Sequence, residues 1–185
     1  MPQRCTTRAF TSVLALIASF GTASAAETDI TIGMQLEPPH LDPTSAAAGA
    51  IDNVVYSNIF EGLTRFMGDG SVVPGLAKSW DISDDGLRYT FHLRGDVQFH
   101  DGTAMDAADV KFSLDRARAE DSTNAQKALF AGIADVAVID PLTVTLTLGA
   151  PNGNLLFNLA WGDAVIVAAE TIETIKANPV GTGAF

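Results

Sequence analysis

The sequence predicts a mixed α/β domain, and three patterns support this fold class. Residues 87–93 alternate apolar and polar side chains, which is the period of a half-buried strand, and residues 142–148 repeat the alternation. Each run follows a turn and a shorter apolar alternation, so two antiparallel hairpins are predicted. Between them, residues 106–118 carry apolar side chains at helical spacing. Paired strands combined with a packed helix are typical of a mixed α/β layer structure.

Residues 1–26 have the composition of a secretory signal peptide. Arg4 and Arg8 precede an apolar run at residues 10–20, and small residues follow at 23–26. This order of basic, apolar and small segments predicts cleavage at the end of the small-residue segment. The apolar run is shorter than the ~20 residues that a membrane span needs. We therefore expect a mature chain that is soluble outside the cytoplasm.

Charge and cysteine content narrow the possible functions. The formal net charge is -11, and the only cysteine, Cys5, lies within the predicted signal peptide. An acidic chain lacks the basic surface that nucleic-acid phosphates require, so no nucleic acid is expected as a partner. A mature chain without cysteine has no thiolate ligand, and the three histidines lack paired spacing such as H-x-x-x-H. No metal or other cofactor is expected.

Patterns of catalysis are missing as well. No serine stands in a G-x-S-x-G nucleophile elbow, and the Walker phosphate loop is absent. His92 falls on the polar side of a predicted strand and is interpreted as a surface residue. His100 and Asp101 belong to a turn, where capping is favoured over chemistry. We expect no enzymatic activity, and a secreted hydrolase is the alternative from a different class.

The first part of the mature chain predicts a strand, a proline-rich loop and a helix. Residues 30–36 have strand character, and the prolines in residues 37–44 prevent a regular helix there. A helix is predicted from about Ser45 to the stop signal at Gly62. Its apolar stripe comprises Ile51, Val54, Val55 and Ile59.

The helix between the hairpins has a start signal and two apolar sides. Asp106 can cap it, and Ala107, Val110, Leu114 and Ala117 share one face. A second apolar side, made by Ala108, Phe112 and Ala119, predicts a helix sandwiched between layers. The other elements expected are turns at 68–70, 85–86 and 140–141, a loop at 121–126, short helices at 127–130 and 155–159, a buried strand at 165–168, a helix at 171–177 and a glycine-rich ending at 178–185.

The proline-rich loop holds the candidate binding residues. Glu37, Pro38, Pro39 and His40 follow a predicted strand and open toward a predicted helix, and such loops of α/β sheets commonly bind ligands. A purely structural elbow is an equally good interpretation of the same residues.

Five segments together carry a family resemblance. They are LDPT at 41–44, IFEGLTRF at 59–66, VVPGLAKSW at 72–80, DGLRYTFHLRGDVQFHDGTAMDAADVKFSLDR at 85–116 and NPVGTGAF at 178–185. In this order they resemble the N-terminal part of the extracytoplasmic solute-binding proteins of family 5, the peptide- and nickel-binding components of ABC importers. Ala184 departs from the proline that the family more often has in the last segment.

The resemblance implies a clamshell of the type II periplasmic binding proteins, in which two α/β lobes close over a ligand. It implies a signal peptide at 1–26, the start of the first lobe at 27–70, an extra subdomain of that lobe at 71–178 and a return to the lobe at 179–185. The second lobe would lie outside a chain truncated at this point. In peptide-binding relatives the loop after the first strand contributes to the cleft.

Residue roles and function follow from the same resemblance. Glu37 would meet a ligand amine beside Pro38, Pro39 and His40, whereas Asp42 would cap the LDP turn. The implied protein is a periplasmic monomer that captures dipeptides or oligopeptides and delivers them to membrane permease subunits served by a separate ATPase. A receptor for a nickel complex, an opine or a sugar is the alternative within the family, and a sensory receptor is a further one.

Overall fold

The main sheet holds both predicted hairpins side by side, in the strand order β3-β4-β6-β5. The computed structural model describes residues 31–45 and 47–185, so the predicted signal peptide lies outside the described residues. All neighbouring strands are antiparallel, and Phe91 opposite Val144 joins the two hairpins. The strands are β3 (Ala77–Ile82), β4 (Arg88–Leu93), β5 (Ile133–Asp140) and β6 (Thr143–Leu148). Both predicted hairpins are confirmed.

The turn of the first hairpin shows why its residues form it. Asp85 accepts hydrogen bonds on Oδ1 from the Ser83 hydroxyl at 2.6 Å and from the Leu87 amide at 3.0 Å. Gly86 has a φ of 67°, a conformation that glycine adopts without steric cost. The turn predicted at Asp85 and Gly86 is therefore confirmed.

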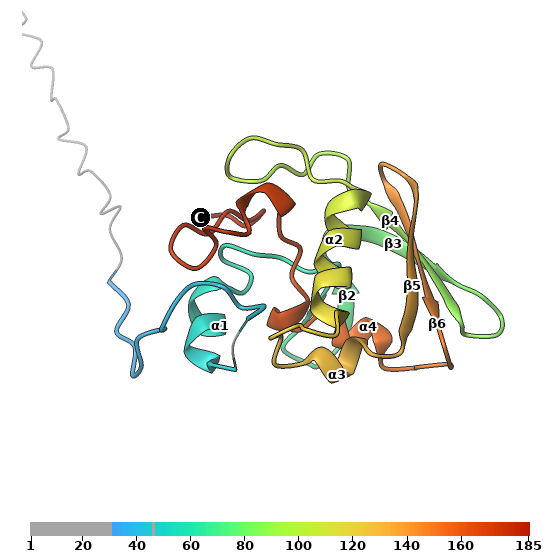
Figure 1. The fold of residues 1–185 in the computed structure, drawn as a ribbon, viewed down its shortest axis with the longest axis horizontal. Helices are drawn as coiled ribbons and strands as arrows, with labels where there is room; N and C mark the ends of the chain where they lie inside the picture. The colour runs from blue at the N-terminus through green and yellow to red at the C-terminus, as the bar shows by residue number, and fades with distance from the viewer. Residues whose placement is uncertain (1–30, 46) are drawn as a thin grey trace, which may run out of the picture. The chain divides into compact units, whose positions relative to one another are not determined.

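One face of the main sheet is packed and the other is wet. The inner face presents apolar side chains that are fully buried, and α2 (Ala107–Arg118) lies along it (Figure 1). The outer face carries threonines, and the hydroxyls of Thr90 and Thr145 lie 3.1 Å apart. The apolar side chains that alternate along β4 and β6 are therefore the buried ones, and the polar side chains between them lie on the outer face.

Helix α2 begins where the sequence predicts. Asp106 Oδ1 accepts a hydrogen bond from the Ala108 amide at 2.7 Å, and Asp109 Oδ2 accepts one from the Asp106 amide at 2.9 Å. This reciprocal capping box satisfies amides that have no partner within the helix. The predicted inner face is fully buried, and it comprises Ala107, Val110, Leu114 and Ala117.

The second side of α2 is only partly covered. Phe112 packs against a separate apolar cluster built around α1 (Gly49–Val55), which includes Ile51 and Val55. Ala108, in contrast, is exposed. The predicted sandwich therefore holds at Phe112 but not along the whole second side.

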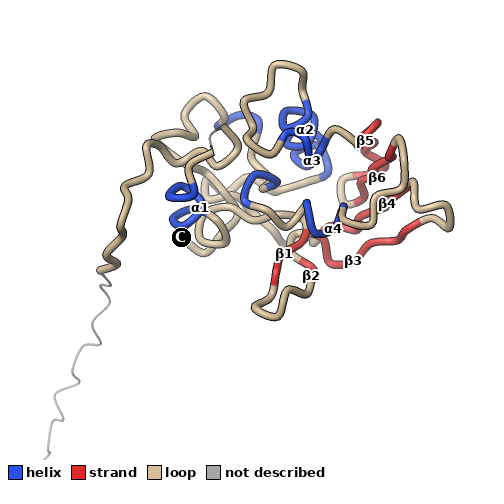
Figure 2. Tube along the Cα trace, turned by 90° about the horizontal axis from the view of Figure 1, so that it is seen from below, coloured by secondary structure: helices blue, strands red, loops and turns tan. Residues whose placement is uncertain are grey.

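Smaller elements complete the unit that comprises Gln35–Phe185. β1 (Thr64–Phe66) pairs antiparallel with β2 (Val72–Pro74), and Figure 2 shows this ribbon beside α4 (Leu155–Asn158). α3 (Lys127–Phe130) and α4 confirm the predicted short helices. Within the described residues, none of the helices has both the length and the apolar character needed to cross a membrane.

Helix α1 is shorter at both ends than the predicted helix. It begins at Gly49 and ends at Val55, so Ile59 lies outside it. The amides of Ile59 and Phe60 both donate to the Val55 carbonyl, at 2.9 and 3.0 Å, and Ser57 adopts a φ of 58°. The helix ends because Tyr56, its C-cap, is extended with φ of -68° and ψ of 129°. The left-handed Ser57 that follows also prevents the helix from resuming before Ile59.

The strand predicted at 30–36 is wrong for the residues that the structure describes. Residues 31–36 join no ladder, and the side chains of Ile32 and Leu36 are 73% and 71% exposed. A strand is stabilised by hydrogen bonds to a neighbour, which a local apolar pattern does not supply.

Two predictions near the C-terminal end, the strand at 165–168 and the helix at 171–177, name the wrong secondary structure. Residues 165–168 are buried as expected, but only Val165 forms a bridge, opposite Gly62. Residues 171–177 form tight turns instead of an α-helix, beginning with the 3-10 turn Ala169–Thr171. The amide of Thr174 donates to Thr171 and that of Ala177 to Thr174, both at 3.0 Å. Threonine and isoleucine are frequent in this segment, and β-branched side chains weaken helix formation.

Candidate ligand-binding site

The four predicted ligand-contacting residues lie together on one loop that leads toward α1. Glu37 and Pro39 are exposed, and Pro38 and His40 are half-buried. The His40 ring is turned toward its own backbone, because its Nδ1 accepts a hydrogen bond from the Asp42 amide at 3.2 Å. No hydrogen bond joins the Glu37 carboxylate to another described residue. Glu37 is therefore accessible to a ligand, although the strand expected before it is missing from residues 31–36.

The turn that ends this loop is fixed by Asp42. Its side chain is 1% exposed, and Oδ1 accepts hydrogen bonds from the Thr44 amide at 2.9 Å and the Thr44 hydroxyl at 2.6 Å. Burial raises the pKa of Asp42, but the Thr44 hydrogen bonds and the Arg116 charge outweigh it and hold that pKa below its ordinary value. Capping of the LDP turn by Asp42 is confirmed.

Arg116 connects this turn to helix α2. Its Nη2 lies 3.3 Å from Asp42 Oδ2, and its Nη1 donates to the Thr44 hydroxyl. The sequence placed Asp42 and Arg116 in two separate motifs and offered no signal that they pair. The ion pair means that the loop carrying Glu37 is anchored directly to the helix that covers the main sheet.

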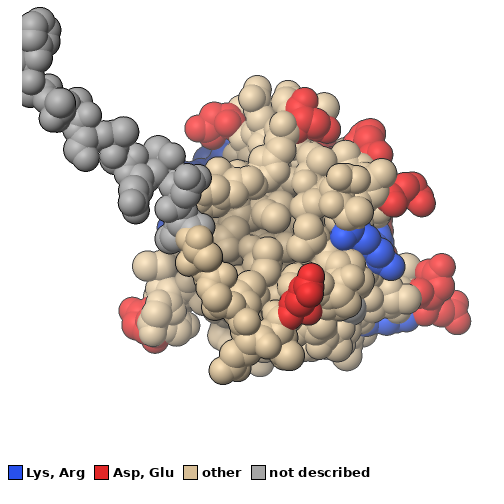
Figure 3. Space-filling model, turned by 90° about the vertical axis from the view of Figure 1, so that its left-hand side faces the viewer, with Lys and Arg blue, Asp and Glu red and all other residues tan. Residues whose placement is uncertain are grey.

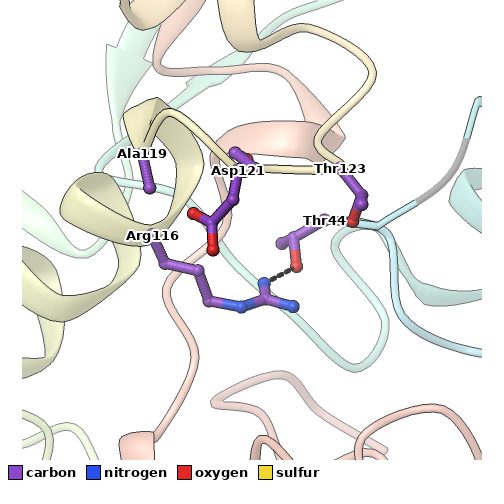
Figure 4. A pocket seen from close by; sticks show the side chains of 6 residues that line it. Thr44, Arg116, Ala119, Asp121 and Thr123 are labelled. Carbon is purple, nitrogen blue, oxygen red and sulfur yellow. Dashed lines mark hydrogen bonds between the residues drawn. The ribbon is translucent and has the colours of Figure 1, made fainter.

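Two polar cavities flank the Arg116 side chain. The smaller one has a volume of about 180 Å³ and lies between Thr44, Arg116, Asp121 and Thr123. Figure 4 shows the Arg116 side chain along this cavity, bonded to Thr44, with the Asp121 carboxylate pointing toward it. The larger cavity, of about 500 Å³, lies on the side of Asp42 and Lys176. Both are lined by acidic and basic side chains together, so each favours a polar ligand over an apolar one.

The described residues contain no group of three or more His, Cys, Asp or Glu side chains able to hold a metal ion. His92 lies at the surface with Nε2 at 2.8 Å from Asp81 Oδ2, as predicted. Asp101 caps its turn, because Oδ1 accepts from the Thr103 amide at 2.9 Å and from the Thr103 hydroxyl at 2.7 Å. These side chains have structural partners and are not brought to the Glu37 loop.

His100 has a role that sequence reasoning missed. Its Nδ1 accepts a hydrogen bond from the Gly181 amide at 3.4 Å, and its Nε2 lies 3.0 Å from the Gly183 carbonyl oxygen. The His100 amide also donates to the Gly181 carbonyl at 2.9 Å. His100 therefore anchors the glycine-rich ending instead of only shaping its own turn.

Two carboxylates that line neither cavity, the buried Asp163 and the half-buried Asp52, lie close to each other. Asp163 is 6% exposed, and burial together with the negative charge of Asp52 raises the pKa of its side chain to about 6. Burial also raises the pKa of Asp52. Asp52 belongs to α1 and Asp163 to the 3-10 turn Gly162–Ala164, so two apolar-rich segments bring like charges together.

The face that includes α1 and the C-terminal end has few charges at its centre. Figure 3 shows most of its acidic and basic side chains toward the edges of the view, with uncharged residues between them.

Comparison with known proteins identifies the family. The model of bacterial extracellular solute-binding proteins, family 5 Middle, matches residues 71–185. The glutathione-binding protein GsiB of Pectobacterium atrosepticum is 38% identical over 149 residues, which cover 78% of this chain and 29% of that protein. The dipeptide-binding protein of Escherichia coli K12 is 30% identical over 199 residues, covering 93% of this chain and 37% of that protein.

A solved structure extends the likeness to the fold. NikZ from Campylobacter jejuni, in complex with Ni(L-His), has a TM-score of 0.70 at 33% sequence identity, and the match covers 80% of this chain and 30% of that one. The predicted mixed α/β fold of the periplasmic binding proteins is confirmed by this match. The chain spans about a third of the length of the curated relatives it matches. The family match over residues 71–185 and these identities show that the chain belongs to the bacterial extracellular solute-binding proteins of family 5.

Proposed function

We propose that this chain is part of the periplasmic binding component of an ABC importer that captures dipeptides or oligopeptides. The observation that carries the proposal is the Glu37 carboxylate, which is exposed on a loop whose base is fixed by the Asp42 and Arg116 ion pair. The names of relatives support a peptide ligand, since one binds glutathione, a tripeptide, and another binds dipeptides.

The loop is suited to meet the amino terminus of a peptide. An exposed carboxylate can accept charge-assisted hydrogen bonds from an ammonium group. Pro38 and Pro39 restrict the backbone beside Glu37, so less conformational entropy is lost when a ligand binds. His40 is held by the Asp42 amide at 3.2 Å and would form the floor next to the carboxylate.

In this proposal residues 27–70 begin the first lobe, 71–178 form its extra subdomain and 179–185 return to it. The ligand would be desolvated between this lobe and a second one. Closure would then change the population of the state that membrane permease subunits recognise, while a separate ATPase supplies the energy. Residues 1–26 would direct the chain to the periplasm, where it would act as a monomer.

Calorimetry on the full-length protein tests the ligand class and Glu37 together. Dipeptides and tripeptides with a free amine should bind, and Glu37→Gln should weaken them by roughly 10- to 100-fold, the equivalent of one charge-assisted hydrogen bond. Peptides with an acetylated amine should be affected little by the substitution. Glu120→Gln is a matched control, because Glu120 is also exposed but lies in the segment after α2.

The outcomes separate the alternatives. Unchanged affinity of Glu37→Gln for free-amine peptides would remove Glu37 from the site while leaving a peptide receptor intact. Binding of Ni(L-His) without any peptide binding would favour the nickel receptor, which the likeness to NikZ supports. Binding of an opine or a sugar alone would favour the remaining family alternatives. Cleavage of a bound peptide during the measurement would favour a hydrolase.

A further inference from the structure

Strand β5 is an edge strand, and its outward backbone groups can be identified from the ladder. The Leu148 amide donates to Leu87 and the Leu93 amide to Leu142, both at 2.8 Å, so even-numbered residues of β6 face β4. Odd-numbered residues of β6 therefore face β5, where Asp135 pairs with Thr147 and Ala137 with Thr145. Asp135 and Ala137 thus direct their N–H and C=O groups toward β6. Their neighbours in β5 direct these groups toward the free edge, and they are Ala134, Val136 and Val138.

Two cations of helix α2 occupy carbonyls at this edge. Lys111 Nζ donates to the Val136 carbonyl at 3.0 Å. Arg118 Nη1 donates to the Ile133 carbonyl at 2.9 Å and to the Ala134 carbonyl at 3.2 Å. Helix α2 lies beside β5 in Figure 1, so these long side chains reach over the edge of the sheet. Two of the three outward carbonyls that an added strand would use, those of Ala134 and Val136, therefore already accept hydrogen bonds from side chains of α2.

Asp115 holds both cations in place. It lies one turn from each on α2, with Oδ2 at 2.7 Å from Lys111 Nζ and Oδ1 at 2.7 Å from Arg118 Nη2. Burial raises the pKa of Asp115, but the hydrogen bonds from Lys111 and Arg118 outweigh it and leave that pKa below its ordinary value. The three side chains therefore form one charged clamp along the edge, named here the α2 clamp.

Without the α2 clamp, the edge would match a second copy of itself. Two β5 strands that pair antiparallel about Val136 place Ala134 opposite Val138, so each outward donor meets an acceptor. Asp135 would lie opposite Ala137, which avoids a clash between like charges. Val138 and Ile139 are 42% and 62% exposed, and they would add apolar contacts across the new pair.

We propose that the α2 clamp of Lys111, Asp115 and Arg118 blocks addition of a second copy of this chain through strand β5, and so keeps the protein monomeric. Exposed sheet edges are templates for such pairing, and charged side chains are a common means of preventing it. This effect of the α2 clamp acts on strand pairing alone, so it does not depend on which ligand the protein binds.

The test replaces both cations by methionine in the chain, as Lys111→Met with Arg118→Met, which keeps the length of the side chains. Light scattering after size-exclusion chromatography should show a shift from monomer to dimer that grows with protein concentration. Adding Val138→Pro should restore the monomer, because proline removes an outward N–H that only the dimer uses. Lys78→Met with Arg88→Met is the matched control, since both residues are exposed and lie elsewhere on the sheet.

Three results would overturn the proposal. One is a folded double variant that remains monomeric at high concentration, and another is a dimer that persists with Val138→Pro. The third is equal dimerisation of the control pair. If the double variant does not fold, Lys111→Met alone frees the Val136 carbonyl and should form a smaller dimer fraction, and a folded single variant that stays monomeric would equally reject the clamp.

Discussion

The carboxylate of Asp42 and the guanidinium of Arg116 form a partly buried ion pair between residues that are 74 positions apart in the chain. The pair joins the loop of the candidate site to the helix that covers the main sheet. Asp42 is 1% exposed and caps its own turn as well, so one side chain fixes both the shape of the turn and its position. Placement of Glu37 therefore depends on a contact that the binding residues themselves do not make.

Removal of the Asp42 carboxylate should destabilise the fold strongly. Asp42→Ala loses the bonds to Thr44 and leaves the partly buried charge of Arg116 without its partner. The expected cost is about 2 to 4 kcal/mol in the free energy of unfolding by urea. Asp69→Ala is the control, because Asp69 bonds the Ser71 amide at 2.9 Å and hydroxyl at 2.7 Å in an exposed turn of the same kind. That control should cost much less, because water replaces the lost hydrogen bonds in an exposed turn.

The same pair predicts a loss of stability in acid. The pKa of Asp42 is lowered in the folded chain from its ordinary value of 3.8. Its contribution is thus complete above pH 3.8 and disappears as the pH falls through the folded pKa. The difference in unfolding free energy between the native chain and Asp42→Asn should shrink below pH 3.8, and a constant difference from pH 7 to pH 2 would contradict this assignment.

His100→Ala should loosen the glycine-rich ending without disturbing the sheet. The substitution removes the ring contacts with Gly181 and Gly183, and we expect a cost of about 1 to 2 kcal/mol. Hydrogen exchange at the amides of residues 181–185 should accelerate, whereas exchange in β4 should not change. His92→Ala serves as the control, because among the described residues the His92 ring forms a hydrogen bond only with the exposed Asp81. Equal acceleration by both variants would rule out a local anchor.

Close packing makes Gly181 sensitive to a single methyl group. A Cβ at this position would overlap the Ile59 carbonyl, which is backbone and cannot move aside as a side chain could. Gly181→Ala should therefore lower the free energy of unfolding by about 1 to 3 kcal/mol. A Cβ at Gly132 would meet nothing within 4 Å, so Gly132→Ala should be tolerated or slightly stabilising. Similar thermal midpoints for the two variants would be evidence against the close approach.

Local patterns predicted those elements whose causes are local. The β4 and β6 strands, the Asp85 turn and the Asp106 cap each depend on residues within a few positions, and the structure confirms them. The α2 face that includes Val110 was predicted for the same reason. Periodicity and capping are encoded in neighbouring residues, so one sequence suffices to identify them.

Features that depend on distant partners escaped sequence reasoning. Residues 31–36 have strand character but no partner strand within the described residues, and residues 165–168 are buried without forming a ladder. The link between Asp42 and Arg116, and that between His100 and Gly183, join segments whose proximity only the fold creates. The candidate loop itself was predicted because prolines and a carboxylate are visible locally.

Asp163 should change the free energy of unfolding with pH in the opposite direction to Asp42. Burial and the charge of Asp52 raise the pKa of Asp163 from 3.8 to about 6 in the folded chain. The folded state thus binds the proton more tightly, and stability from this group is complete below pH 3.8 and is lost as the pH rises to about 6. Asparagine resembles the protonated acid, so Asp163→Asn should change little at pH 4 but stabilise the chain at pH 8. Because water still reaches part of this pair, we expect Asp163→Asn to raise the free energy of unfolding at pH 8 by about 1 to 2 kcal/mol.

Urea unfolding at both pH values measures the difference, with Asp84→Asn as an exposed control. Asp52→Asn should reduce the effect of Asp163→Asn, since it removes the neighbouring charge. An equal gain at pH 4 and pH 8 would show that the carboxylate is not strained by burial and charge.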